Sequence, residues 1–140
     1  MSRALGLDHG DARIGVAVSD ELGMLAHPLE TIAVKEKEPL GRIAEIVAEK
    51  SITTIVLGLP KNMDGTSGPA TEKVRVFADQ LRARVPACKV VLWDERLTTV
   101  AAQKSLHAAG RNAKQSRAVI DQAAAQLILQ GWLDSQSMAL

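Results

Sequence analysis

The sequence has little cysteine, few aromatic residues and almost no net charge. Its one cysteine, Cys88, excludes an internal disulfide framework and any cysteine-based zinc site. A net charge of +1 provides no overall field to attract nucleic acid, so nucleic-acid binding would depend on local basic patches. One Phe, two Trp and no Tyr are too few for a surface that stacks single-stranded bases on aromatic rings.

Long apolar runs are missing as well. No stretch approaches the roughly 20 apolar residues of a membrane span, and the N-terminus carries no signal-peptide pattern. We therefore expect a cytoplasmic protein without a membrane partner. The length of 140 residues, with 46% hydrophobic and 24% charged residues, predicts a single globular domain over residues 1–140.

Hydrophobic periodicity predicts strands in the first third of the chain and alternating helices and strands after it. The expected strands are 4–7, 13–19, 28–33, 53–57 and 89–93, and the expected helices are 39–49, 70–84, 99–109 and 116–133. The first two strands, joined by turn residues, should form an antiparallel hairpin. Three antiparallel strands followed by two parallel strands predict a mixed five-stranded α/β sheet flanked by helices, unlike a fully parallel sheet.

Asp8 ends the first apolar strand, and two interpretations of it are open. It can be a turn residue that introduces the hairpin, since Asp side chains stabilise turns. It can instead be a metal ligand at the carboxyl end of a central strand, where α/β sheets usually place their sites.

Asp121 is more informative, because it lies on or beside the apolar stripe of the last helix. That stripe consists of Ile120, Ala124, Leu127, Ile128 and Gly131. An ionised carboxylate there is costly unless a cation or hydrogen bonds compensate it. It also lies about five residues beyond Ser116, the expected N-cap, which is too deep to interact with the helix dipole in the first turn. The alternative is a boundary residue paired with Arg117.

Glu95 stands between the fifth strand and the following helix. It can pair with Arg96 in a capping region, or it can join Asp8 and Asp121 in an acidic cluster; Asp64 and Asp94 are the competing carboxylates. Such a cluster suits Mg²⁺ or Mn²⁺, which prefer oxygen ligands. Two ions about 4 Å apart can activate a water molecule and stabilise the leaving oxygen of a phosphodiester.

Four ordered motifs resemble the YqgF/RuvX family of Holliday junction resolvases, in the RNase H-like superfamily. They are residues 6–17 (GLDHGDARIGVA), 58–60 with 62–66 (GLP and NMDGT), 94–99 (DERLTT), and 120–124 with 128–130 (IDQAA and ILQ). The resemblance covers nearly the whole chain. It implies that Asp8, Glu95 and Asp121 are the acidic active-site residues and that a divalent metal is the cofactor. It also implies one of two substrates, precursor 16S ribosomal RNA or branched DNA.

The resemblance also raises a question of geometry. In many RNase H-like nucleases the second acid follows the fourth strand, whereas Glu95 follows the fifth. Its side chain would have to reach across a strand spacing of about 4.8 Å. Asp64, which follows the fourth strand, is the substitute if Glu95 does not reach.

Basic residues could bind the substrate. Arg13 and Arg96 flank the acids and could hold a phosphate or neutralise the cluster in the metal-free protein. The most concentrated basic run consists of Lys104, His107, Arg111, Lys114 and Arg117. It can be a solvated surface or a track for the nucleic-acid backbone, which would bind without base specificity. The three histidines lack metal-ligand spacing.

Two other functions are weighed against the nuclease. Residues 8–15 also resemble the phosphate-binding hairpin of actin-like ATPases and sugar kinases, but those proteins close two lobes over a nucleotide and this chain has room for one. A ribosome-assembly factor that binds RNA with little catalysis is the other alternative. Resolution of a four-way junction would favour a homodimer, since two equivalent strands need two cuts.

Overall fold

The computed structural model describes residues 3–97 and 113–138 of the chain. Its elements are β1 (Arg3–His9), β2 (Arg13–Ser19), β3 (Ala26–Ala33), α1 (Pro39–Lys50), β4 (Ile52–Leu59), α2 (Pro69–Arg84), β5 (Lys89–Asp94), the 3₁₀ turn η1 (Glu95–Leu97) and α4 (Ala113–Met138). Every strand predicted from the sequence is present, as are three of the four helices. The expected helix 99–109 lies outside the described residues.

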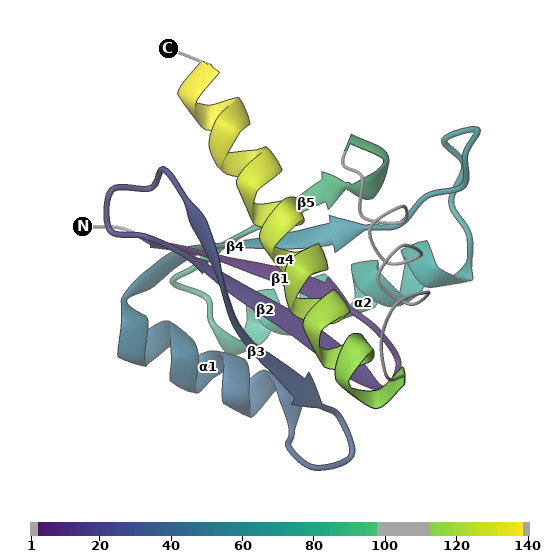
Figure 1. The fold of residues 1–140 in the computed structure, drawn as a ribbon, viewed down its shortest axis with the longest axis horizontal. Helices are drawn as coiled ribbons and strands as arrows, with labels where there is room; N and C mark the ends of the chain where they lie inside the picture. Colours follow the sequence, from purple (N-terminus) through teal and green to yellow (C-terminus); the bar gives the residue numbers. More distant parts are fainter. Residues whose placement is uncertain (1–2, 98–112, 139–140) are drawn as a thin grey trace.

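The strands form one mixed sheet in the order β3-β2-β1-β4-β5 (Figure 1). β1 pairs with β2 and β2 with β3 in antiparallel fashion, while β1 pairs with β4 and β4 with β5 in parallel. The predicted fold class is therefore confirmed. β1 is the central strand, which places its carboxyl end, with Asp8, between two neighbouring strands.

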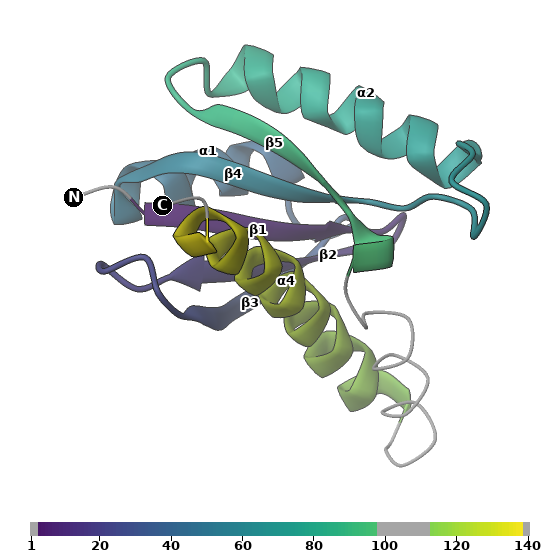
Figure 2. The same cartoon turned by 90° about the horizontal axis from the view of Figure 1, so that it is seen from above.

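Helices cover both faces of the sheet, and Figure 2 shows α2 and α4 on opposite sides of it. Residues of α1 and α2 share a core cluster with β1, β2 and β4. From α2 this cluster includes Val74, Phe77, Ala78 and Leu81. The second cluster consists mainly of α4 residues packed against small side chains of the strands. In the part of the chain that the structure describes, no helix is long and apolar enough to cross a membrane.

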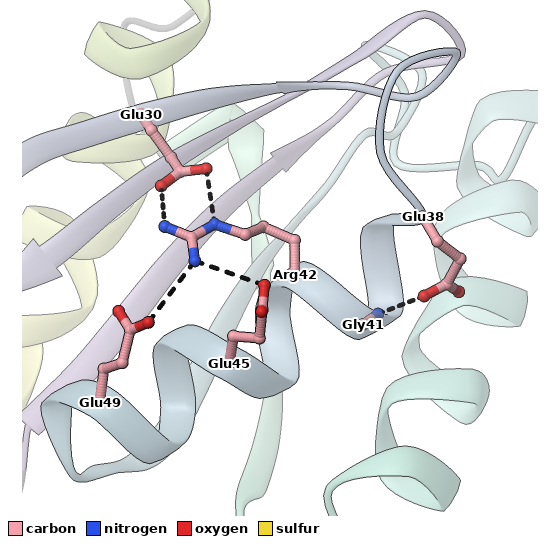
Figure 3. A network of polar contacts seen from close by, with 6 residues as sticks. All are labelled: Glu30, Glu38, Gly41, Arg42, Glu45 and Glu49. Atoms are coloured by element: carbon pink, nitrogen blue, oxygen red, sulfur yellow. Dashed lines mark hydrogen bonds and ion pairs between the residues drawn. The ribbon is translucent and has the colours of Figure 1, made fainter.

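Arg42 of α1 ties this helix to the edge strand β3 (Figure 3). Its Nη2 and Nε donate to the Glu30 carboxylate at 2.7 and 3.1 Å, and its Nη1 lies 3.5 Å from Glu45 and 3.7 Å from Glu49. The hydrogen bonds from Arg42 hold the pKa of Glu30 below its ordinary value. At the start of α1 the Glu38 carboxylate accepts from the Gly41 amide and so caps the helix.

Three local predictions are wrong. Asp8 lies inside β1, which extends to His9, so it is a strand residue and not part of the turn. Ser116 is not an N-cap, because α4 already begins at Ala113. The fourth strand was expected to span 53–57, yet β4 continues to Leu59, which is buried.

Candidate active site

Asp8 lies on the central strand with a glycine beside it on each neighbouring strand. The register pairs Asp8 with Gly15 of β2. On the other side Leu7 pairs with Leu57 of β4, so Gly58 comes next in line beside Asp8. Paired residues in a sheet point to the same face. Asp8, 5% exposed, is thus a buried carboxylate flanked by two positions without side chains.

This face of the sheet is the one that α4 covers. A Cβ added to Gly6, two residues before Asp8 and on the same face, would meet Leu129 of α4. A Cβ added to Gly15 would lie 1.9 Å from the carbonyl oxygen of Asp121 and 3.0 Å from its Cβ. The backbone of α4 therefore rests directly on β2 at Gly15, and this contact brings Asp121 beside Asp8.

Glu95 approaches Asp8 from the β4 side of β1, whereas Asp121 approaches it from the β2 side. A Cβ added to Gly58 would lie 2.8 Å from Glu95 Oε1 and 3.2 Å from Glu95 Cγ. Gly58 pairs with Trp93 of β5, so Glu95, which follows β5 in η1, folds back over β4 toward β1. Because Gly58 has no side chain, the Glu95 side chain can lie across β4 at this position.

The competing carboxylates have other surroundings. Asp64 lies in the exposed loop after β4, where its Oδ1 accepts from the Thr66 hydroxyl at 2.6 Å and the Thr66 amide at 3.0 Å. These hydrogen bonds lower the pKa of Asp64. Asp94 forms an ion pair with Arg96 at 2.7 Å, which holds the pKa of Asp94 below its ordinary value. Of the five acids, Asp121 and Glu95 are the two in contact with the glycines that flank Asp8.

Arg13 is bonded to one of these acids, Asp121. Its Nε donates to Asp121 Oδ2 at 2.7 Å, and the two side chains are 34% and 14% exposed. Arg117, which the sequence suggested as a partner of Asp121, is an exposed residue of α4. The bond of Asp121 with Arg13 joins residues 108 positions apart. Arg96 bonds Asp94 and lies near Gly65 in the loop after β4. Lys104, Arg111 and the Lys114 side chain lie outside the described residues.

The chemistry of this group fits a hard divalent cation, because Asp8, Glu95 and Asp121 offer carboxylate oxygens, which such cations prefer as ligands. Within residues 3–97 and 113–138, however, no three acidic, histidine or cysteine side chains are gathered as ligands of one ion. Asp121 instead points its Oδ2 at Arg13.

Gly15 and Gly58 are the two positions of the candidate site that were not expected from the sequence. Glycine inside a strand often marks the close approach of another backbone or a ligand. Both glycines stand within predicted motifs, at 15 and 58, and this rule would have pointed to them.

Comparison with known proteins shows which family the chain belongs to. The family model described as RuvX, Holliday junction resolvase, matches residues 2–135. A protein of Acetivibrio thermocellus named as a candidate pre-16S rRNA nuclease is 48% identical over 140 residues, covering 99% of both chains. A Bacillus subtilis protein with the same name is 50% identical over 138 residues, covering 95% of this chain and 98% of its own.

Among solved structures, Thermus thermophilus RuvC in complex with a Holliday junction has the same fold. It matches with a TM-score of 0.59 at 13% identity and covers 98% of this chain and 96% of its own. A second structure of T. thermophilus RuvC matches with a TM-score of 0.54 at 14% identity, covering 97% and 96%. The RNase H-like architecture expected from the sequence is thereby confirmed.

Proposed function

The chain belongs to the RuvX family and is a nuclease, and we propose that it hydrolyses phosphodiester bonds of structured nucleic acid with divalent cations held by Asp8, Glu95 and Asp121. The observation that carries this proposal is the pair of glycines beside Asp8, because they admit Glu95 from η1 and Asp121 from α4 to the same face of the sheet. Asp8 is itself only 5% exposed, and a carboxylate so deeply buried in the central strand is costly unless cations or hydrogen bonds compensate its charge.

Bound Mg²⁺ or Mn²⁺, two ions in this proposal, would supply an activated water and neutralise the charge that develops on the leaving oxygen. The protein's own residues perform the positioning. Asp8 is fixed by the central strand, and Asp121 is fixed by the contact of α4 with Gly15. Arg13 and Arg96 are the proposed phosphate-binding residues, with Lys104, Arg111, Lys114 and Arg117 as a proposed track for the backbone of the nucleic acid.

Two substrates fit this chemistry. The names of the relatives favour precursor 16S ribosomal RNA, and the description of the family favours a four-way DNA junction. We place the ribosomal RNA first, because this name is shared by full-length relatives about half identical to this chain. Action on a junction would also require a symmetric dimer, since both strands must be cut. In either case we propose a cytoplasmic location.

The test offers labelled precursor 16S ribosomal RNA and a labelled four-way junction to the same purified protein, with Mg²⁺, with Mn²⁺ or with a chelator. We expect metal-dependent shortening of the RNA at its 5′ end. Paired symmetric nicks in the DNA without RNA cleavage would assign the other substrate. Binding of RNA without cleavage of either substrate would favour the ribosome-assembly factor and contradict the proposal.

A further inference from the structure

We propose that Arg13 and a divalent cation compete for the Asp121 carboxylate, so that Arg13 holds this side chain in the metal-free protein and releases it when metal binds. The inference deepens the proposed function and rests on it, since it takes Asp121 to be a metal ligand. It makes Arg13 a positioning residue of the metal site as well as a candidate phosphate-binding residue.

The geometry supports this competition. Arg13 lies two residues before Gly15 on β2. Residues two apart in a strand lie on the same face, so the Arg13 side chain points to the face that α4 covers. The Asp121 backbone is fixed against Gly15, while its carboxylate reaches to Arg13 Nε at 2.7 Å. Rotation of the Asp121 side chain about a fixed backbone is thus sufficient to exchange one partner for another.

The Asp121 carboxylate needs a cationic partner to compensate its charge, with or without metal. The Asp121 side chain is only 14% exposed, and a carboxylate so largely removed from water is costly without a nearby cation. Arg13 supplies that cation in the metal-free protein. A divalent cation on the same carboxylate would repel the adjacent guanidinium strongly in this partly buried place, and hard cations take the carboxylate oxygens as ligands.

The Arg13–Asp121 ion pair is not required to hold α4 in place. This helix buries Ala124, Ala125, Ile128 and Leu129 against the sheet, each 1% exposed or less. Its docking therefore persists when the ion pair opens, and a variant without Arg13 should fold. Because coupling between two ligands is reciprocal, Arg13 must weaken metal binding by the same factor by which metal weakens the Arg13–Asp121 bond.

The direct test follows the Arg13 Nε–H signal in ¹H–¹⁵N spectra during titration with Mg²⁺, which is diamagnetic. The signal is assigned by its loss in Arg13→Gln. We expect a slowly exchanging Nε–H in the metal-free protein and faster exchange with water as Mg²⁺ binds, with the same midpoint as the calorimetric binding curve.

A second measurement compares Mn²⁺ affinities by calorimetry. Arg13→Gln should bind Mn²⁺ at least about fivefold more tightly than wild type, which is the lower end of typical coupling between sites. Arg82→Gln is the control for net charge: Arg82 bonds Asp79 and the Val90 carbonyl near the start of β5, at the other end of that strand from Glu95. This control should leave the Mn²⁺ affinity unchanged.

The outcomes separate the two proposals. If Mg²⁺ binds and the Arg13 Nε–H stays protected, competition is refuted while the metal-dependent nuclease stands. Tighter Mn²⁺ binding by Arg13→Gln without any loss of that protection in wild type would indicate repulsion at a distance, and it would also overturn the inference. If neither Mg²⁺ nor Mn²⁺ binds to wild type, both proposals fail.

Discussion

Substitution of Gly15 by alanine should displace the helix that carries Asp121. The added Cβ would lie 1.9 Å from the Asp121 carbonyl oxygen and 2.3 Å from its carbonyl carbon, and these are backbone atoms of a helix, which cannot rotate away. To restore ordinary contact, α4 must retreat from β2 by roughly 1.5 Å. Overpacking against backbone should cost about 3 kcal/mol, at the upper end of such changes, and lower Tm by about 10 °C.

The same displacement should reduce catalysis. A shift of about 1 Å in a catalytic group can cost about 100-fold in rate, so we expect at least that loss for Gly15→Ala under single-turnover conditions well below its Tm. Thermal unfolding followed by circular dichroism gives the stability, and cleavage of a labelled substrate with Mn²⁺ gives the rate.

A matched control separates stability from positioning. Leu81→Ala removes a fully buried side chain from α2, on the opposite face of the sheet, and should cost about 2–5 kcal/mol. Its folded fraction should cleave at nearly the wild-type rate. If Gly15→Ala cleaves as fast as Leu81→Ala at equal stability, the close contact between α4 and β2 does not position the active site, and the reasoning is wrong.

Three further predictions concern the same structure. Gly58→Ala would place a Cβ 2.8 Å from Glu95 Oε1 and 2.5 Å from Ile128 Cδ1. The ends of these side chains can move, so we expect a loss of only about 1 kcal/mol in stability but a clear fall in the cleavage rate. An unchanged cleavage rate would contradict the role of Gly58 in placing Glu95. Glu95→Gln should lower cleavage at least about 100-fold, whereas Asp64→Asn should change it less than about threefold; the reverse order would make Asp64 the second acid. Glu30→Gln should lower stability at neutral pH by about 1 kcal/mol. Arg42 lowers the pKa of Glu30 from its ordinary 4.5, so the difference in stability between wild type and Glu30→Gln should be complete above pH 4.5 and disappear as pH falls through the lowered pKa. A difference in Tm that is constant down to strongly acidic pH would refute this.

The fold was predictable from the sequence because its signals are local. Alternation in residues 13–19 and the β-branched run 53–57 indicate strands, and the change to helical spacing from residue 39 marks where the antiparallel part ends. Handedness and short connections then leave few ways to order five strands. The ends of elements were less predictable, as Asp8 and Ser116 show, since tertiary packing extends a strand or helix beyond its local signal.

The candidate site depends on contacts that no local pattern contains. The motif around Asp8 suggested its importance, but the pairing of Asp8 with Gly15 follows from sheet register. The Arg13–Asp121 bond joins β2 to α4 and requires the packing of the whole helix on the sheet. How Glu95 crosses β4 was likewise hidden, because the sequence does not show that the Glu95 side chain lies where Gly58 has no side chain.

The measurement that tests the central claim most directly is single-turnover cleavage by Asp8→Asn with Mn²⁺, alongside substrate binding in Ca²⁺. Asparagine has nearly the shape of aspartate without its charge, so β1 and the buried position of residue 8 should be kept. We predict no detectable cleavage and nearly unchanged substrate binding. Cleavage by Asp8→Asn at the wild-type rate would contradict the account, because the carboxylate between Gly15 and Gly58 would then have no part in the reaction.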